Sequence, residues 1–140
     1  LSEREKHVAD TNAQIAAVRR QSEVLAQAIY DLPDAPEASA DFAPLFTAYQ
    51  AYRQEVDRLN NLIHQLAAVA PDLTEHLRDS FDPAMEEANA LCDDSIATFR
   101  DEESDPSDYQ RALTSLCLCV ERYASAVTAV SRAYANLPGS

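Results

Sequence analysis

The sequence predicts an all-α protein, an antiparallel up-down-up-down four-helix bundle. Three observations support this fold class. Glycine occurs once among the 140 residues, whereas the tight hairpins of a sheet protein depend on it. Hydrophobic residues make up 46 % of the chain, which suffices for one sizeable core. These residues recur every three or four positions in four long segments, and that is the spacing of one helix face.

The first helix is expected at about residues 2–31, with Ser2 as its N-cap. Polar residues interrupt the apolar seam in the first half of this segment, which leaves a second architecture open. In that alternative, a three-helix bundle carries residues 1–31 as an extended N-terminal coiled coil. The prolines within Leu32–Pro44 predict a connection too short to run back along a helix, which favours antiparallel neighbours.

The second helix, expected at about residues 42–70, has the most regular apolar stripe in the chain. Asp41 is the expected N-cap, and Pro44 is tolerated in the first turn. Pro71 ends this helix, and residues 73–80 are expected to form a short helical link. The predicted inward positions of the second helix are Phe42, Leu45, Tyr49, Tyr52, Val56, Leu59, Ile63, Leu66 and Ala70.

The third and fourth helices are expected at about residues 83–103 and 106–137. An Asp-Pro pair begins each of them, because aspartate caps a helix and proline is favoured at its first position; these pairs are Asp82-Pro83 and Asp105-Pro106. Pro138-Gly139 is expected to end the last helix. The predicted inward positions of the third helix are Met85, Ala88, Cys92, Ser95 and Phe99.

The four helices are expected to form one domain over residues 1–140. Because the first residue is Leu1 rather than methionine, we expect this domain to be a segment of a larger protein. No run of about 18 apolar residues occurs, so we expect no direct membrane insertion.

The charge of the chain is strongly acidic, with a formal net charge of −13. Residues 71–105 hold 12 acidic and 2 basic side chains, and they carry most of the excess. This balance argues against a broad basic patch that binds nucleic acid or an anionic membrane surface.

The three cysteines, Cys92, Cys117 and Cys119, lack the spacing of a disulfide framework. We interpret them as small packing residues, and we expect an intracellular, cytoplasmic location because disulfides are rare there. Cys117 and Cys119 are two positions apart on a helix, so they point in nearly opposite directions and cannot share one metal ion.

No catalytic apparatus is visible, and we expect neither enzyme activity nor a cofactor. A di-iron site in a bundle needs a glutamate three residues before a histidine, and neither His64 nor His76 has one. His64 has a faint similarity to the histidine of phosphotransfer bundles, but the sequence after it lacks their lysine and glycine-containing stretch. We interpret His64 as a surface residue.

The first candidate interaction surface is the acidic face of the third helix. Its carboxylates repeat every seven residues, opposite the inward stripe, and they continue into the next connection. Two interpretations stay open: an ordinary solvated face, or a docking surface for a basic protein partner. The candidate residues are Glu86, Glu87, Asp93, Asp94, Asp101, Glu102 and Glu103.

The second candidate surface lies on the last helix, which is apolar on nearly all sides around Leu118. Such a helix is normally buried on every side, so one interpretation makes it the central helix, or makes Leu118 a single exposed leucine that needs no explanation. The other makes Leu118 part of a contact with another protein or a second copy of the chain. The candidate residues are Ser115, Leu118, Arg122 and Ser125.

These observations lead to two hypotheses for function. The first is a non-catalytic protein-interaction or scaffold module of a larger cytoskeletal or multi-subunit-complex protein, which could also self-associate. The alternative is a ligand-sensing bundle of a membrane receptor. Tyrosines on the inward stripes would distinguish the two hypotheses by lining a small-molecule pocket; they are Tyr49, Tyr52, Tyr109, Tyr123 and Tyr134.

Overall fold

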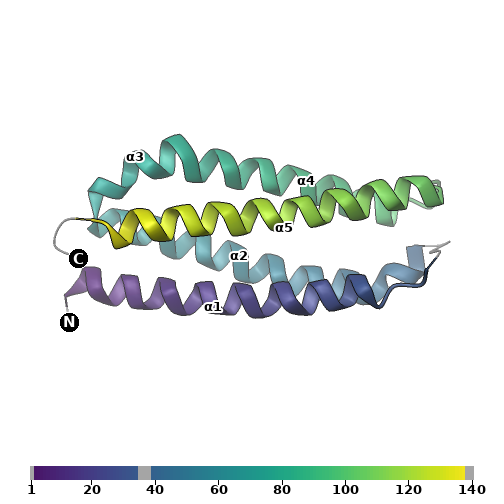
Figure 1. Cartoon of the computed structure of the whole chain (residues 1–140), viewed down its shortest axis with the longest axis horizontal. Coiled ribbons are helices and arrows are strands. Elements are labelled where there is room, and N and C mark those ends of the chain that lie inside the picture. The colour runs from purple at the N-terminus through teal and green to yellow at the C-terminus, as the bar shows by residue number, and fades with distance from the viewer. Residues whose placement is uncertain (1, 35–38, 138–140) are drawn as a thin grey trace.

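The computed structural model describes residues 2–34 and 39–137, and in these residues the chain is helical with no strand (Figure 1). Four long helices lie side by side in an up-down-up-down arrangement, and both ends of the described chain lie at the same end of the bundle. The predicted four-helix bundle is confirmed, and the three-helix alternative is wrong. The helices are α1 (Glu3–Tyr30), α2 (Ala43–Val69), α4 (Asp82–Arg100) and α5 (Pro106–Ala135).

The bundle consists of two antiparallel hairpins. The closest backbone packing joins α1 to α2 and α4 to α5, whereas α1 approaches α5 at few places. Aromatic side chains join the hairpins: the Phe42 ring stacks on Phe99 with a centroid distance of 4.6 Å and lies 4.8 Å from Tyr109. The hairpins therefore depend on side-chain packing to hold together.

The core follows the predicted stripes closely. On α4 all five predicted inward residues are buried, and on α2 every predicted position is buried except the half-buried Tyr49. On α5 the three tyrosines predicted to face inward, Tyr109, Tyr123 and Tyr134, are buried, and the smaller Ala112, Cys119 and Ala126 are buried as well. Burial of these side chains is what stabilises helices that are marginal alone.

α1 packs on α2 although its apolar seam is weak. Two polar residues, Thr11 and Gln14, are buried in this contact. The Gln14 amide donates to the backbone carbonyl of Glu55 at 3.0 Å and to the Glu55 carboxylate at 2.8 Å. The Thr11 hydroxyl donates to the carbonyl of His7 at 2.7 Å. Because their hydrogen bonds are satisfied, these residues can occupy core positions without a large penalty.

The segment between α2 and α4 is helical, as predicted, but the predicted restart at Asp82-Pro83 is wrong. A 3-10 turn (η2, Pro71–Leu73), one α-helical turn (α3, Thr74–His76) and a π-helical turn (η3, Leu77–Phe81) lead directly into α4. Asp82 has helical backbone angles, and its N–H donates to the carbonyl of Leu77. The wider π turn before Pro83 lets the helix continue past a residue that cannot donate.

The helix ends agree with the predictions in part. Ser2 caps α1 as predicted, since its hydroxyl accepts from the Glu5 N–H at 3.1 Å. Asp105 caps α5 in a reciprocal capping box with Asp108, both bonds being 2.9 Å long. Asp41 is not the N-cap of α2, because a 3-10 turn (η1, Ser39–Phe42) precedes that helix.

Two further boundary predictions differ in outcome. α4 ends at Arg100 instead of residue 103, because Asp101 adopts extended angles and its carboxylate accepts from the Glu103 N–H at 2.9 Å. That local bond competes with the helical one. The predicted stop at Pro138-Gly139 lies outside the described residues.

The cysteine prediction is wrong for two of the three residues. Cys92 on α4 and Cys119 on α5 are fully buried and joined by a disulfide, with their Cα atoms 5.8 Å apart. Antiparallel packing brings together two positions that lie 27 residues apart in sequence. Cys117 is free and exposed, so the two neighbouring cysteines of α5 do point in different directions, as their spacing predicts.

Among the described helices, α5 alone has the length and the apolar composition of a membrane-spanning helix. The core helix of a bundle can have the same length and composition. In this bundle 33 % of its apolar stretch is buried.

We predict that the disulfide stabilises the fold substantially. A cross-link that closes a loop with a sequence separation of 27 residues is worth about 3.5 kcal/mol in the chain-entropy model. Reduction should therefore lower the melting temperature by roughly 10 °C. Thermal melts of the Cys117→Ser variant, with and without reductant, measure this difference, because that variant retains only the two paired cysteines. Equal melting temperatures in both conditions would contradict the prediction.

Candidate protein-interaction surface

The acidic residues predicted on the third helix do not form one surface. They lie in two rows that face different neighbours. Glu87, Asp94 and Asp101 line depressions shared with α5, whereas Asp93 lines a groove shared with α2. Glu86 lies beside Asp57 of α2. Each row repeats every seven residues, so rows one position apart diverge to the two sides of the helix.

The residues predicted on the last helix meet the first acidic row in a groove on the outer face of the α4–α5 hairpin. We call this the Leu118 groove. It has a volume of about 420 Å3. Leu118 is 39 % exposed within it, so the interpretation of α5 as a fully buried central helix is wrong. The groove is lined by Ser80, Ala84, Glu87, Leu118, Glu121, Arg122, Ser125, Ala126 and Ala129.

Small side chains explain why this face is hollow. Alanines and serines occupy most of the wall positions, so the two helix backbones leave a channel that larger residues would fill. One ion pair, between Arg122 of α5 and Glu87 of α4, crosses the groove. The Nε atom of Arg122 is buried and has no hydrogen-bond partner in the part of the chain that the structure describes. An unmet donor of this kind is costly unless a water or a partner accepts from it.

A polar cleft continues along the same face, at the other end of the hairpin. It has a volume of about 350 Å3 and includes Asp94 and Asp101 of the first row and the predicted Ser115. At its edge the Arg111 guanidinium pairs with the Asp108 carboxylate. We call it the acidic cleft. Glu102 and Glu103 are exposed in the loop after α4 and are not among its lining residues.

The second acidic row is engaged with α2. The Arg53 guanidinium donates to the Asp93 carboxylate at 3.2 Å, to the Tyr49 hydroxyl at 2.9 Å and to the Asp57 carboxylate at 3.3 Å. Its pKa is raised; burial acts against this, but the neighbouring Tyr123, Tyr49 and Asp57 favour the cation more strongly. Asp93 is therefore partly neutralised within the bundle. The sequence offered no signal for this pair, since its members lie 40 residues apart.

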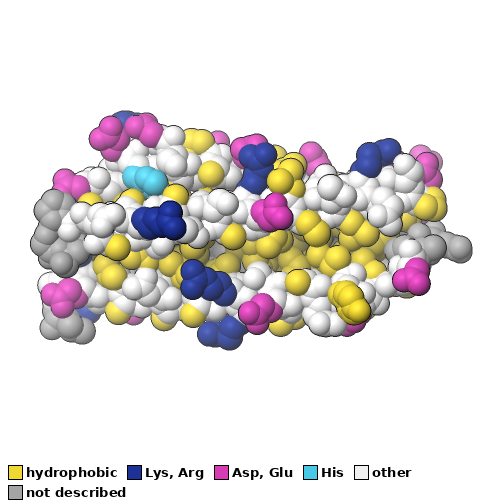
Figure 2. Space-filling model, viewed as in Figure 1, with side chains coloured by type: hydrophobic (Ala, Val, Ile, Leu, Met, Phe, Trp, Pro, Cys, Tyr) yellow, Lys and Arg dark blue, Asp and Glu magenta, His cyan; other side chains and the backbone are white. Residues whose placement is uncertain are grey.

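The predicted tyrosines differ in their surroundings, and two of them line a cavity between α1 and α5. Figure 2 shows recessed apolar atoms between these helices. The cavity has a volume of about 80 Å3, and the rings of Tyr52 and Tyr123 in it lie 6.0 Å apart. It is lined by Ile15, Val18, Arg19, Ser22, Tyr52, Val120, Tyr123, Ala124, Val127 and Thr128. We call it the tyrosine cavity.

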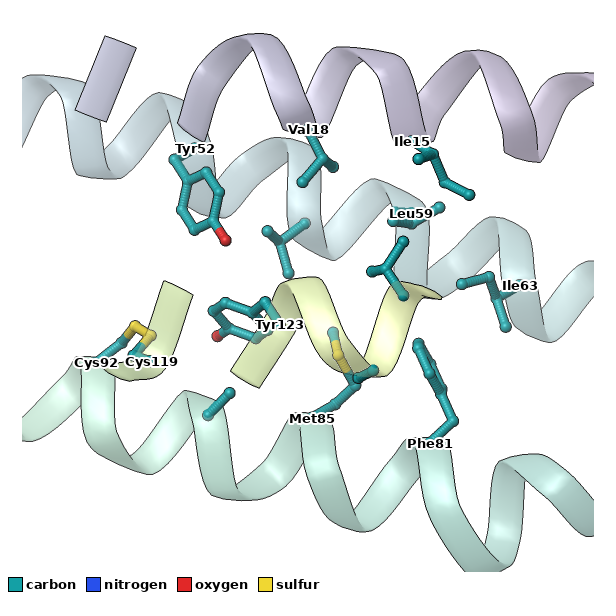
Figure 3. Close-up of a cluster of buried hydrophobic side chains, with 14 of the residues drawn as sticks. Ile15, Val18, Tyr52, Leu59, Ile63, Phe81, Met85, Cys92, Cys119 and Tyr123 are labelled. Carbon is teal, nitrogen blue, oxygen red and sulfur yellow. A yellow bond between two sulfur atoms is a disulfide. The ribbon is translucent and has the colours of Figure 1, made fainter. Parts of the chain in front are cut away.

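The hydroxyl groups of these tyrosines are not equivalent. Tyr123 donates to the Asn89 side chain, and Tyr134 donates to the Asn12 side chain, linking α5 to α1. Tyr52 is 1 % exposed, but its hydroxyl is not among the buried unpaired atoms of residues 2–34 and 39–137, which are His76 Nε2 and Arg122 Nε. Its ring extends from α2 into the space between α1 and α5 (Figure 3).

The described residues offer few other candidates for a metal-binding or phosphotransfer site. No group of three metal-ligating side chains occurs among them. His64 is exposed, as predicted, but it contacts the Asp82 carboxylate at 2.9 Å. His64 of α2 and Asp82 at the start of α4 therefore form a surface contact between the two hairpins.

Comparison with known proteins gives no match to any protein-family model, curated protein sequence or solved structure.

We predict that buried tyrosines make the fold sensitive to alkali. Burial raises the pKa values of Tyr52 and Tyr123 by disfavouring the charged phenolate. Unfolded tyrosine ionises near pH 10, so above that pH the unfolded state loses protons that the folded state keeps. The free energy of unfolding should therefore fall by about 1.4 kcal/mol per pH unit for each such tyrosine.

Denaturant unfolding at several values between pH 9 and pH 11 measures this slope. Tyr52→Phe should make the decline shallower by about one tyrosine's share. Tyr30→Phe is the matched control, because Tyr30 is 84 % exposed. A wild-type slope in Tyr52→Phe would show that ionisation of this side chain does not cause the loss.

Proposed function

We propose that this chain is a non-catalytic interaction module that binds a basic amphipathic helix of a partner protein along the outer face of the α4–α5 hairpin. The observation that carries the proposal is the convergence of candidates from both helices on one face. Glu87, Leu118, Arg122 and Ser125 share the Leu118 groove, and Asp94, Asp101 and Ser115 share the acidic cleft.

The shape of this face supports a helical partner. Glu87, Asp94 and Asp101 follow one another at intervals of seven residues along α4. At 1.5 Å per residue they span roughly 21 Å, the length of a helix of about 14 residues. A channel with small walls and one exposed leucine suits the apolar face of such a helix.

The charge of this face supports a basic partner. The residues that line the Leu118 groove and the acidic cleft include five carboxylates and two arginines. Carboxylates along the groove attract lysine and arginine side chains and raise the encounter rate. A second copy of this chain is disfavoured as the occupant, because its own net charge of −13 would repel.

The disulfide affects the argument for the cellular compartment of this protein. The expected cytoplasmic location rested on three unpaired cysteines, and the bond between Cys92 and Cys119 removes that premise. Disulfides persist mainly in oxidising compartments. A cytoplasmic location stays a prediction.

The alternative function, a ligand-sensing bundle of a membrane receptor, is favoured by one observation. Tyr52 and Tyr123 line the tyrosine cavity, as this hypothesis requires. The two ends of the described chain lie at the same end of the bundle (Figure 1), an arrangement compatible with attachment to one membrane surface.

We predict that Leu118→Asp weakens partner binding at least tenfold while the helix content stays constant. The reason is that a charge would be placed in the apolar part of the groove. The probe is a synthetic 18-residue helix with leucines at spacings of three and four and lysines elsewhere, titrated by fluorescence anisotropy. Val24→Asp is the matched control, since Val24 is an exposed apolar residue of α1. An equal loss of peptide affinity in both variants would contradict binding in the Leu118 groove.

We predict that charge reversal separates the two acidic rows. The Glu87→Lys, Asp94→Lys double variant should weaken peptide binding at least tenfold and reduce its salt dependence, because carboxylates beside the peptide become repulsive. The Glu86→Lys, Glu102→Lys double variant makes the same change of charge outside both depressions on this face. If both variants lose the same affinity, net charge alone governs binding, and docking on this face is excluded.

A further inference from the structure

The tyrosine cavity has the properties of a small-molecule site. α1 and α5 approach each other at few places, so a space remains between them over the core. Ile15 and Val18 of α1 face Val127 of α5 across it. Figure 2 shows the recessed apolar strip, and Figure 3 shows Ile15, Val18, Tyr52 and Tyr123 around it. An apolar space with a few polar groups is the usual composition of a ligand site.

One polar group that lines the cavity is the Tyr52 hydroxyl. The Tyr52 side chain is 1 % exposed, but its hydroxyl oxygen is not one of the fully enclosed unpaired atoms of the described residues. The neighbouring Tyr123 hydroxyl is already used by Asn89. A hydroxyl that lines an apolar space can donate to an oxygen acceptor on a bound molecule and so fix its orientation.

The mouth of the cavity carries a cation. Arg19 lines the opening together with Ser22 of α1 and Thr128 of α5. Arg19 is exposed, and it makes no ion pair with any residue in the ranges 2–34 and 39–137. A guanidinium at the mouth of an apolar space favours a ligand with a carboxylate at one end.

The size of the cavity limits the ligand. A volume of about 80 Å3 is roughly half that of an apolar cavity of ~150 Å3 that holds benzene. The cavity therefore holds about three carbons, so the charged end of a ligand and the carbon next to it lie in the mouth.

We propose that the tyrosine cavity binds a short-chain oxo- or hydroxy-monocarboxylate, with its carboxylate on Arg19, its chain between Ile15, Val18 and Val127, and its second oxygen on the Tyr52 hydroxyl. This inference rests on the alternative function, ligand sensing, and names the class of ligand. It is independent of the Leu118 groove, so the peptide experiments and the ligand experiment can fail separately.

Three matched probes test the proposal: 4-oxopentanoate, pentanoate without the keto oxygen, and pentan-2-one without the carboxylate. Titration of the full chain, followed by NMR shifts of Ile15, Val18 and Val127, gives both the affinity and the place of binding. We expect 4-oxopentanoate to bind about tenfold more tightly than either other probe, which corresponds to ~1.4 kcal/mol for each lost polar contact.

Two variants assign the contacts. Tyr52→Phe should weaken 4-oxopentanoate about tenfold and leave pentanoate unchanged. Arg19→Gln should weaken both acids about tenfold and leave pentan-2-one unchanged, so that 4-oxopentanoate no longer binds more tightly than pentan-2-one. The matched controls are Tyr30→Phe and Arg20→Gln, whose residues are exposed and do not line the cavity.

A third variant, Ala124→Leu, fills the cavity from an exposed position and should abolish binding of all three probes without lowering the melting temperature. Equal affinities of the three probes for the wild type, or binding that Arg19→Gln and Tyr52→Phe leave unchanged, would overturn the ligand class. If no probe shifts these three resonances, the cavity is not a ligand site, and the support for the ligand-sensing function is lost with it.

Discussion

Close antiparallel packing of α4 against α5 is the contact on which most features of this protein depend. It brings Cys92 to within bonding distance of Cys119, and it places Arg122 opposite Glu87. The same pairing creates the Leu118 groove, because the outer positions of both helices hold alanine and serine. If these helices shifted by one turn, all three arrangements would be lost together, since a helix turn advances a residue by about 5.4 Å.

α1 stands in contrast to this pair. Its contact with α2 is secured by hydrogen bonds from a buried amide, Gln14, to Glu55. Its contact with α5 is sparse, and the Tyr134 hydroxyl bonded to Asn12 is one of the few links. The tyrosine cavity lies at this sparse contact, where the backbones of the two hairpins approach each other at few places.

α5 contributes to both candidate sites, on opposite sides of its axis. Leu118, Arg122 and Ser125 face the groove, and Tyr123, Val127 and Thr128 face the cavity. This explains the unusual composition of the helix, which is apolar on nearly every side although one side is exposed. Leu118 on the groove side and Thr128 on the cavity side are both exposed, so both surfaces are open to a partner or a ligand.

The sequence by itself determined the fold class, the four helices and most of the buried stripe, because these follow from local spacing and capping. Met85, Cys92 and Phe99 could be assigned to the core from their intervals alone. Only the tertiary structure decided which distant residues meet: the Cys92–Cys119 bond, the Arg53–Asp93 pair and the division of the acidic face into two rows. The physical reason is that helical periodicity fixes the direction of a side chain about its own axis, whereas the register between helices depends on packing that no local pattern records.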